Sequence, residues 1–357
     1  MLRILLLGAD WHGSDALGLA RAFRRLGHAV RHVAPDRFVP NLGRGLGPRV
    51  VRRVIRPMCH MAFQRAVLDE VEVFRPDCVL VFKGNGVSPA LLRDLRARGL
   101  CLVNFYPDVS FLCHGKDVRE GLALYHHIFT TKSFGIADMQ RILGLESAEF
   151  LPHGFDPDIH RPLCVRPDDM EALGADASFI GTWSPKKEAM LASLAAVSPH
   201  IRLRIWGSQW EKATAPQIRG VVGGRHLLGD TYPLAIGASR INIAILSEQR
   251  EGASSGDLTT SRTFHIPASG GFMLHERTHE LLQFYDEGKE VACFGSAEEL
   301  VEKTRYYLDN EEEREAIRLA GHRRCVAENS LDGRATRIVQ WFREQHGEQP
   351  GDHFGKE

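Results

Sequence analysis

The chain has 357 residues, of which 43% are hydrophobic and 25% charged, the balance of a soluble globular protein with room for two domains. Lysine and arginine together number 45, as do aspartate and glutamate, so the bulk charge gives no indication of nucleic-acid binding. The seven cysteines are dispersed, and the apolar runs are too short for a membrane span, which together indicate a cytoplasmic protein.

The first part of the chain predicts strands alternating with helices. The run RILLLG is a buried-strand pattern that ends at Gly8, and Ser14 can cap a helix from Asp15 to about Leu26. Further strands are predicted in HAVRHVAP, PDCVLVFKG, CLVNFYPD, HHIFTTK and AEFLPHG, with helical segments between them. Strand, helix and strand at this spacing predict βαβ units and a parallel sheet.

A Pro- and Asp-rich segment, HGFDPDIHRPLCVRPDD, interrupts this pattern and is interpreted as an interdomain linker. A second series of strand patterns follows in ASFIGTW, IRLRIWG, RINIAIL, GGFMLH and EVACFG, and it predicts a second parallel sheet. Three closing helices are predicted at residues 297–308, 311–328 and 334–345. The last of them is expected to cross back onto the first domain.

The predicted fold class is therefore α/β, with two Rossmann-like doubly wound domains facing across a cleft. The expected boundaries are a first domain at residues 1–160, a linker at 161–175, a second domain at 176–335, and a C-terminal helix with a disordered tail at 336–357. Because ligands bind at the carboxyl ends of strands in such sheets, this architecture indicates an enzyme with one substrate in each domain.

The loop after the first predicted strand contains Gly8, Gly13 and Gly18, whose spacing departs from the GxGxxG of dinucleotide-binding proteins. The loop still lies between the end of a strand and the start of a helix. His12 is therefore either a polar residue of the cleft or an ordinary surface histidine.

Asp156 and Asp158 form an Asp-x-Asp triplet, which holds a divalent metal in many nucleotide-sugar enzymes. Here the triplet lies in the Pro-rich segment, where turn chemistry accounts for both residues. We expect no bound metal.

The stretch RGLGPRVVRRVIRP carries five arginines between Arg44 and Arg56 and no acidic residue. It could form a peripheral contact with a membrane surface or an anionic acceptor. A solvated face is the favoured alternative.

The phrase SRTFHIPASGG follows the predicted fourth strand of the second sheet and reads as a helix that ends at a pair of glycines. A helix N-terminus and the guanidinium of Arg262 suit a diphosphate, and Gly270 and Gly271 would let the backbone approach a ligand. The alternative is a plain junction between a helix and a strand, with glycine as the helix cap.

The segment from Ser261 to Arg324 resembles the CgeB-like, glycosyl-transferases-group-1 type of GT-B glycosyltransferase. There the matching phrase has the form R-x-F-E-x-x-A-x-G-G, followed by a strand, an EEL helix and an A-G helix. The resemblance extends upstream through SFIGTWSPKKEAML, RLRIWGSQW and GDTYPLAIGASRINIAI, and the segment PHGFDPDIHRP resembles the family's linker. The first domain matches only generically, in FRPDCVLVFKG and NFYPD.

This resemblance implies a metal-independent transferase without a cofactor, which moves a sugar from a nucleotide-sugar donor to a saccharide, lipid-linked or protein acceptor. The synthesis of surface polysaccharide or glycoconjugates is the implied role. The C-terminal domain would hold the nucleotide and the N-terminal domain the acceptor. Carried over by position, the donor-binding residues would be Gly181 with Lys186 or Lys187 at the diphosphate, Trp206 and Gly207 at the base, and Ser261, Arg262, Gly270 and Gly271 at the phosphates and sugar.

One position departs from the family pattern. Related retaining transferases carry two acids in a Glu-x7-Glu arrangement, whereas this chain has Asp257 at the first and His265 at the second. A neutral imidazole can accept one ribose hydroxyl bond where a carboxylate can accept two. His265 therefore binds the ribose with fewer bonds, or the nucleotide sits differently, or the site is degenerate. The remaining alternative is a buried histidine bonded to the backbone.

In the first domain, His12, Asp108 and His114 follow predicted strand ends and are the candidate catalytic residues, through contact with acceptor or sugar. Two other functions stay open. A nucleotide-sugar epimerase has the same fold class, and a non-catalytic glycosyltransferase-like assembly protein would suit the loss of the carboxylate at His265.

Overall fold

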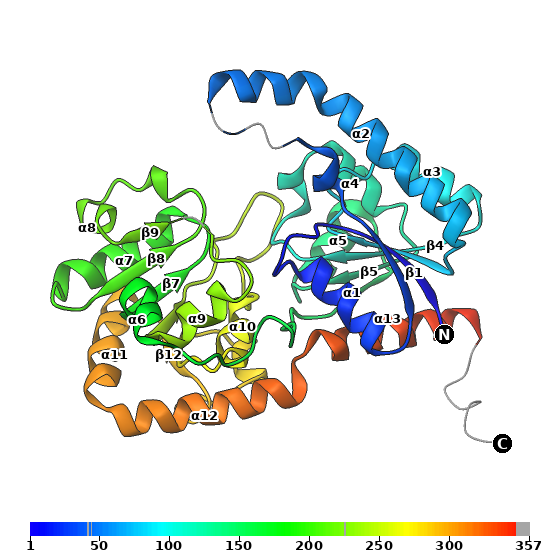
Figure 1. Cartoon of the computed structure of the whole chain (residues 1–357). Helices are drawn as coiled ribbons and strands as arrows, with labels where there is room; N and C mark the ends of the chain where they lie inside the picture. The colour runs from blue at the N-terminus through cyan, green and yellow to red at the C-terminus, as the bar shows by residue number, and fades with distance from the viewer. Residues whose placement is uncertain (41–42, 44, 225, 348–357) are drawn as a thin grey trace. The chain divides into compact units, whose positions relative to one another are not determined.

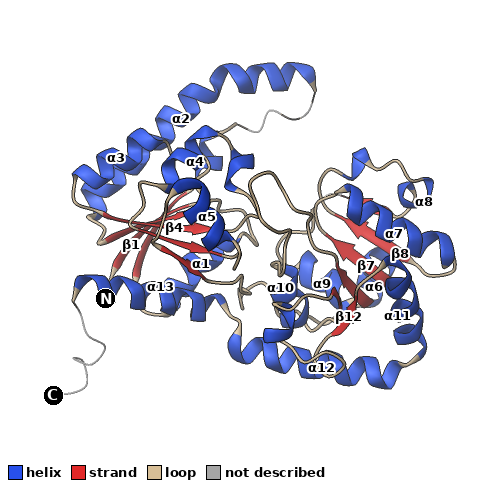
Figure 2. Ribbon diagram, turned by 180° about the vertical axis from the view of Figure 1, so that it is seen from behind, coloured by secondary structure: helices blue, strands red, loops and turns tan. Residues whose placement is uncertain are grey.

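The computed structural model describes residues 1–40, 43, 45–224 and 226–347 and divides the chain into two compact units. The first unit comprises Met1–Pro152 together with the segment that begins at Leu331, and the second comprises His153–Ser330. Each unit is built around a parallel sheet with helices on its faces, and both are Rossmann-like as predicted (Figure 1, Figure 2).

The sheet of the first unit has the strand order β2-β1-β3-β4-β5-β6, with every pair parallel. The predicted strands are confirmed as β1 Arg3–Leu7, β2 Ala29–Val33, β3 Cys78–Phe82, β4 Cys101–Tyr106, β5 His127–Thr130 and β6 Ala148–Phe150. The helices are α1 Asp15–Arg25, α2 Leu46–Phe74, α3 Pro89–Ala97, α4 Lys116–Leu122 and α5 Gly135–Leu143, with short 3-10 turns at Pro35–Phe38 and Phe111–His114. As predicted, the hydroxyl of Ser14 caps α1 by accepting from the amide of Leu17.

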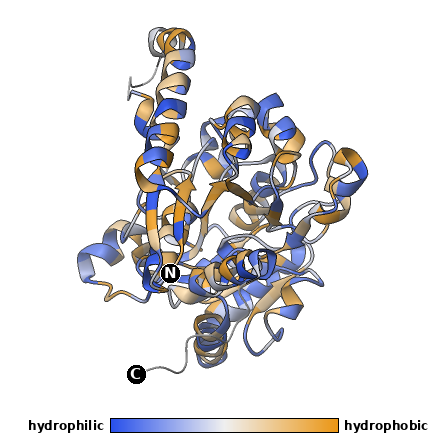
Figure 3. Cartoon of the chain, turned by 90° about the vertical axis from the view of Figure 1, so that its right-hand side faces the viewer, coloured by the Kyte–Doolittle hydropathy of each residue, from blue (hydrophilic) through white to orange (hydrophobic). Residues whose placement is uncertain are grey.

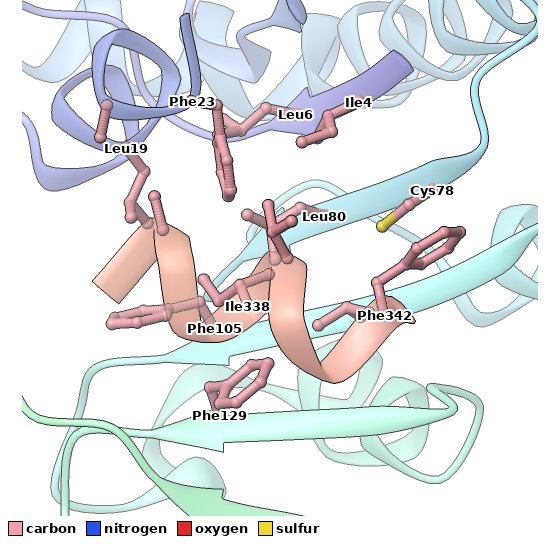
Figure 4. Close-up of a cluster of buried hydrophobic side chains, with 14 of the residues drawn as sticks. Ile4, Leu6, Leu19, Phe23, Cys78, Leu80, Phe105, Phe129, Ile338 and Phe342 are labelled. Carbon is pink, nitrogen blue, oxygen red and sulfur yellow. The ribbon is translucent and has the colours of Figure 1, made fainter. Parts of the chain in front are cut away.

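The C-terminal helix α13 (Leu331–His346) belongs to the first unit because its apolar face completes the core on one side of that sheet. Figure 4 shows Ile338 and Phe342 lying among side chains of α1 and of the sheet. Two ion pairs fix the helix: Arg25 contacts Asp332 at 2.6 Å, and Arg337 contacts Glu149 at 2.7 Å. The expected return of the last helix to the first domain is confirmed.

The sheet of the second unit has the order β12-β11-β10-β7-β8-β9, again parallel. Its strands are β7 Ala175–Ile180, β8 Leu203–Trp206, β9 Val222–Gly224, β10 Ser239–Ala244, β11 Met273–Glu276 and β12 Ala292–Phe294. Its helices are α6 Pro167–Leu173, α7 Pro185–Val197, α8 Pro216–Arg219, α9 Thr231–Gly237, α10 Arg262–Ala268, α11 Ala297–Asp309 and α12 Glu311–Glu328, with 3-10 turns at Trp210–Lys212 and Leu281–Gln283.

Three features differ from the expected organisation. The units divide at Pro152 and His153, and residues 161–175 lie within the second unit, where they contain α6. Strand β9 was not predicted because two of its three residues are glycines. From Leu46 onward, the arginine-rich stretch forms the first half of the 29-residue helix α2, which includes Pro57, while Arg44 lies outside the described residues. Among the helices of the described residues, none combines the length and apolar composition needed to span a bilayer.

Candidate functional site

The carboxyl ends of β7, β8, β10 and β11 lie along one edge of the second sheet because these strands are parallel. The chain turns from β7 directly into α7, whose first turn carries Lys186 and Lys187. After β10 it follows an irregular loop, residues 245–261, before α10 begins at Arg262. A loop of this length in a compact domain is commonly functional.

Lys187 is 4% exposed and is held by neutral oxygen atoms. Its Nζ donates to the hydroxyl of Ser247 at 3.1 Å and to the carbonyl of Thr182 at 3.3 Å. Burial, together with the charge of nearby Arg262, lowers the pKa of Lys187 to about 8. Desolvation of the cation therefore outweighs the neighbouring carboxylates Asp257 and Glu248, which act in the opposite direction.

Arg262 joins the carboxyl ends of β7 and β10. Its guanidinium donates to the carbonyl oxygens of Ile245 at 2.8 Å and Ile180 at 3.4 Å, and it lies 5.2 Å from the ring centre of Phe179. Burial lowers the pKa of this guanidinium. Its Nε is buried without a hydrogen-bond partner within the described part of the chain. Lys187 and Arg262 thus form a pair of desolvated cations at the strand ends.

Gly181 leaves the space that Arg262 occupies. A Cβ at this position would lie 2.7 Å from Nη1 of Arg262 and 2.9 Å from Phe179. Gly207 makes a similar close approach, since its φ is +138° and a Cβ would lie 2.0 Å from the carbonyl oxygen of Gly181. Both predicted glycines therefore lie beside the cation pair, where larger side chains do not fit.

Lys186 is directed to a different partner. Its Nζ contacts Glu276 at 2.6 Å, and its amide donates to Glu248 at 3.0 Å. Glu276 also accepts from the amide of Leu246 at 2.9 Å, while Asp257 accepts from the amide of Ser247 at 3.3 Å. Lys187, rather than Lys186, therefore lies with Arg262.

Sequence reasoning did not single out Ser247, Glu248 or Glu276 as site residues. The usable signal was their position, since Ser247 and Glu248 are the first polar residues after β10 and Glu276 is the last residue of β11.

Trp206 and Gly207 were expected to seat the base. The side chain of Trp206 is 3% exposed and packs where a Cβ at Gly223 would lie only 2.8 Å from its Nε1. The Trp206 ring is thus a packing element between β8 and β9, and Gly207 alone of the two faces the strand-end loops.

Gly270 and Gly271, which were expected to border the phosphates and sugar, are placed at the opposite edge of the sheet from Lys187 and Arg262. Helix α10 runs back along the sheet, and the glycines precede β11, whose first residue Met273 pairs with Asn242. A Cβ at Gly271 would lie 2.4 Å from Ile236 and 2.7 Å from Asn242. Gly270 has a φ of +76°, the left-handed conformation of a helix end. The conformation and packing of both glycines agree with the alternative of a plain junction between a helix and a strand.

Ser261 precedes α10, and its carbonyl accepts from the amides of Phe264 and His265. Its side chain makes no capping hydrogen bond to the helix. Helix α10 has only seven residues, so its N-terminus offers little dipole to an anion. Any anion bound there would depend on the side chain of Arg262.

His265 is 7% exposed, and its Nε2 lies 3.1 Å from the carbonyl oxygen of Gly154. Its ring stacks on His160 at 3.6 Å between ring centres and meets Tyr232 edge-on. Burial lowers the pKa of His160 to about 3, so the stacked partner is neutral. This arrangement matches the alternative of a buried histidine bonded to the backbone, and a ribose contact would have to use Nδ1.

In the first unit, Asp108 and His114 are brought together at the ends of the sheet strands, and Lys83 joins them. The Asp108 carboxylate contacts Nζ of Lys83 at 2.6 Å and Nε2 of His114 at 3.1 Å. Burial acts to raise the pKa of Asp108, but the hydrogen bond from His114 and the charge of Lys83 outweigh it and hold the pKa well below its usual range. Asp108 is therefore a permanent hydrogen-bond acceptor and a poor proton acceptor.

Lys83 has a φ of +65°, which is uncommon outside glycine and often accompanies a functional site. It follows β3 in the sequence VFKG, a strand-end position that sequence reasoning did not select. Lys83 and Asp108 line a cavity of about 570 Å³, with Phe82, Pro107 and Trp11 among its other walls. His12 is exposed and does not line this cavity.

The Asp-x-Asp triplet forms the turn that its surroundings predict. The Asp156 carboxylate accepts from the amide of Asp158 at 3.1 Å, and the Asp156 carbonyl accepts from the amide of His160 at 2.7 Å. Across the described residues, no group of three or more His, Cys, Asp and Glu side chains has the arrangement to hold a metal ion.

Comparison with known proteins agrees with this geometry. Residues 186–340 match the family model described as glycosyl transferase-like. This match confirms the resemblance to group 1 GT-B glycosyltransferases and does not extend to the narrower CgeB-like group. No curated protein sequence matches the chain.

Solved structures with the same two-unit architecture cover almost the whole chain. Sucrose-phosphate synthase from Thermosynechococcus elongatus has a TM-score of 0.68 at 12% identity, covering 98% of this chain and all of its own. HepE from Anabaena, in complex with UDP, has a TM-score of 0.63 at 10% identity, covering 96% of this chain and all of its own. UDP-GlcNAc 2-epimerase from Neisseria meningitidis, bound to UDP-GlcNAc, has a TM-score of 0.54 at 11% identity, covering 96% and 100%. The fold is GT-B.

The position of Gly271 generates a first prediction. Because a Cβ there would overlap Ile236 and Asn242, Gly271→Ala should lower the free energy of unfolding by about 1–3 kcal/mol, measured by urea denaturation. Gly220→Ala is the control and should leave stability nearly unchanged, since Gly220 has open space around it and a negative φ. A Gly271→Ala variant as stable as the native protein would contradict this packing.

Proposed function

We propose that this protein is a metal-independent glycosyltransferase that takes its sugar from a nucleoside-diphosphate donor bound at the carboxyl edge of the second sheet. The observation that carries the proposal is the pair of desolvated cations, Lys187 and Arg262, at the edge where Rossmann-like sheets bind their ligands. Two buried positive charges raise the free energy of the empty site. A diphosphate placed between them would stabilise both charges and supply an acceptor for Nε of Arg262.

The comparisons support this choice of ligand. HepE has been solved with UDP, with UDP and glucose, and with UDP-glucose. The glycosyl transferase-like match begins at Lys186 and includes Lys187 and Arg262. UDP and its sugars are therefore the first ligands to test.

The proposed reaction depends on stabilising the leaving group. As the bond between the sugar and the diphosphate breaks, negative charge grows on the departing phosphate, and Lys187 and Arg262 are fixed in place to receive it. Neither residue has to move, because both are held by main-chain carbonyls or by Ser247. Glu276 and Glu248 hold Lys186 and the loop after β10 beside them.

The acceptor is proposed to occupy the 570 Å³ cavity of the first unit. Its apolar walls suit the face of a sugar ring or a lipid-linked group, and the ionised Asp108 can accept a hydrogen bond from an acceptor hydroxyl. Lys83 and His114 hold Asp108 in position from two sides. A saccharide or lipid-linked acceptor of surface polysaccharide or glycoconjugate synthesis has this chemistry.

An epimerase that acts on the nucleotide sugar alone is the second candidate, since UDP-GlcNAc 2-epimerase has the same fold. Incubation with UDP-sugars in the absence of an acceptor separates the two. An epimerase converts the sugar, whereas a transferase leaves it unchanged or slowly hydrolyses it.

The diphosphate contact gives the second prediction. Arg262→Ala should weaken UDP binding tenfold or more, because a charged hydrogen bond of this kind contributes about 1.5–3 kcal/mol. Binding of uridine, which has no phosphate, should change little. Isothermal titration with both ligands measures the two affinities.

Two further variants keep that test decisive. Arg240→Ala removes an arginine that donates to the carbonyl of Leu308 at the other edge of the same sheet, and it should leave UDP binding unchanged. Lys187→Gln serves if Arg262→Ala unfolds, and it should also weaken UDP more than uridine. Equal losses for UDP and uridine would show that Arg262 is structural and would remove the basis of the proposal.

The lowered pKa of Lys187 gives the third prediction. Lys187 is cationic below about pH 8 and neutral above it, so UDP affinity should fall between about pH 7 and pH 9.5. Lys187→Arg keeps its charge throughout this range and should remove the pH dependence. Without UDP, the free energy of unfolding should change in the opposite direction with pH. The Lys187 amine binds its proton more tightly in the unfolded chain than in the folded protein, so stability should rise as the pH increases above 8. A UDP affinity in the native protein that is constant across this range would argue against contact with Lys187.

Metal independence gives the fourth prediction. Transfer in excess EDTA should proceed at the rate seen with added magnesium or manganese, because the proposed site uses Lys187 and Arg262 in place of a metal ion. A strict requirement for a divalent ion would overturn this part of the proposal and direct attention back to Asp156 and Asp158.

A further inference from the structure

The first half of α2 carries an apolar face that the first unit leaves uncovered. We call residues 46–62 the basic arm. Val50, Val51, Val54, Met58 and Met61 are each between 45% and 70% exposed, and four of them follow the spacing i, i+4, i+8 and i+11 of one helix face. Figure 3 shows this helix with hydrophobic and hydrophilic colours along its length.

The packed face of α2 points the other way. Phe63, Val67 and Val71 are buried in the core of the first unit and repeat every four residues. At 100° per residue, this row lies on the side of the helix opposite Val54 and Met58. The apolar residues of the basic arm are therefore not a continuation of the core. A helix with a second apolar face of this kind gains stability from a partner.

The charge around this face has one sign. From Arg37 to Leu68 the sequence has seven arginines and no acidic residue, although the whole chain has a net charge of zero. Arg52, Arg53 and Arg56 are exposed on the arm, on the sides away from Val54 and Met58. An apolar face with arginines on the remaining, polar side is the pattern of a helix that lies in the interface of an anionic membrane.

The arm also adjoins the acceptor cavity of the first unit. Arg56, Cys59, His60 and Phe63 from α2 line that cavity, and the half-exposed Trp11 lies in its wall. These lining residues lie on the packed side of α2, so a surface bound to Val54 and Met58 would lie on the side of the helix away from the cavity.

We propose that the basic arm docks the protein on an anionic lipid bilayer, with the apolar face inserted at the level of the head groups and the arginines bound to lipid phosphates. A second copy of the chain is disfavoured because two arms of the same charge repel each other. Nucleic acid would bind the arginines but would leave the apolar face exposed to water. The bilayer is the partner that matches both features.

Co-sedimentation of the purified protein with vesicles tests this inference, using phosphatidylcholine with and without phosphatidylglycerol. We expect binding only when phosphatidylglycerol is present, and weaker binding as salt is raised. Arg52→Gln with Arg53→Gln should weaken it about 25-fold, since each arginine near an anionic surface contributes a factor of about five. Val54→Asp should weaken it at least tenfold.

Val73→Asp is the matched control, because Val73 is 80% exposed on the same helix but lies outside the arginine-rich part. It should bind vesicles as the native protein does. Equal loss in Val54→Asp and Val73→Asp, or binding unaffected by any of these changes, would overturn the proposal. So would concentration-dependent self-association in sedimentation velocity that Val54→Asp abolishes, since the arm would then bind a second copy. The assay contains no nucleotide, so its outcome is independent of the donor site.

Discussion

The candidate site of the second unit is organised by one interaction: the guanidinium of Arg262 donates to carbonyl oxygens at the ends of β7 and β10, the two central strands of the sheet. Gly181 has to be a glycine so that this guanidinium fits, and the ring of Phe179 covers one of its faces. The same contact places Arg262 near Lys187 at the start of α7. The positive charge of Arg262 therefore helps burial to lower the pKa of Lys187. The fold and the proposed ligand site would therefore use the same side chain.

Much of the fold could be predicted from the sequence because the strands are buried and their patterns are local. The predicted 311–328 helix coincides with α12, and each predicted strand is present. Helix α2 escaped prediction because it contains Pro57 and has apolar residues on two opposite faces, which removes the usual helical periodicity. The true boundary at Pro152 was hidden because the Pro-rich segment that follows packs into the second unit, with Asp156 and His160 buried.

The candidate site was predicted less well, for two physical reasons. Lys186 and Lys187 are adjacent on a helix, so they point about 100° apart, and only the structure separates the partner of Glu276 from the partner of Ser247. Gly270 follows Arg262 by eight residues, but α10 carries the chain away from the ligand edge of the sheet. Closeness in sequence is thus a poor guide to closeness in space wherever a helix intervenes. Lys83 was missed because a left-handed backbone conformation at a lysine leaves no trace in the sequence.

The two sheets present different electrostatics at their carboxyl edges, and this difference supports the proposed placement of the two substrates. In the first unit, Lys83 contacts the carboxylate of Asp108 directly, so the two charges cancel. The carboxylate oxygens of Asp108 can still accept hydrogen bonds from hydroxyl groups. In the second unit, Lys187 and Arg262 donate their described hydrogen bonds to carbonyls and a hydroxyl, which leaves their charge uncompensated by direct contact. A partly apolar cavity in which Lys83 is paired with Asp108 would suit the proposed sugar acceptor, whereas two desolvated cations would favour the proposed diphosphate. An exchange of substrates between the units would therefore require both the Lys83–Asp108 pair and the Lys187–Arg262 pair to change.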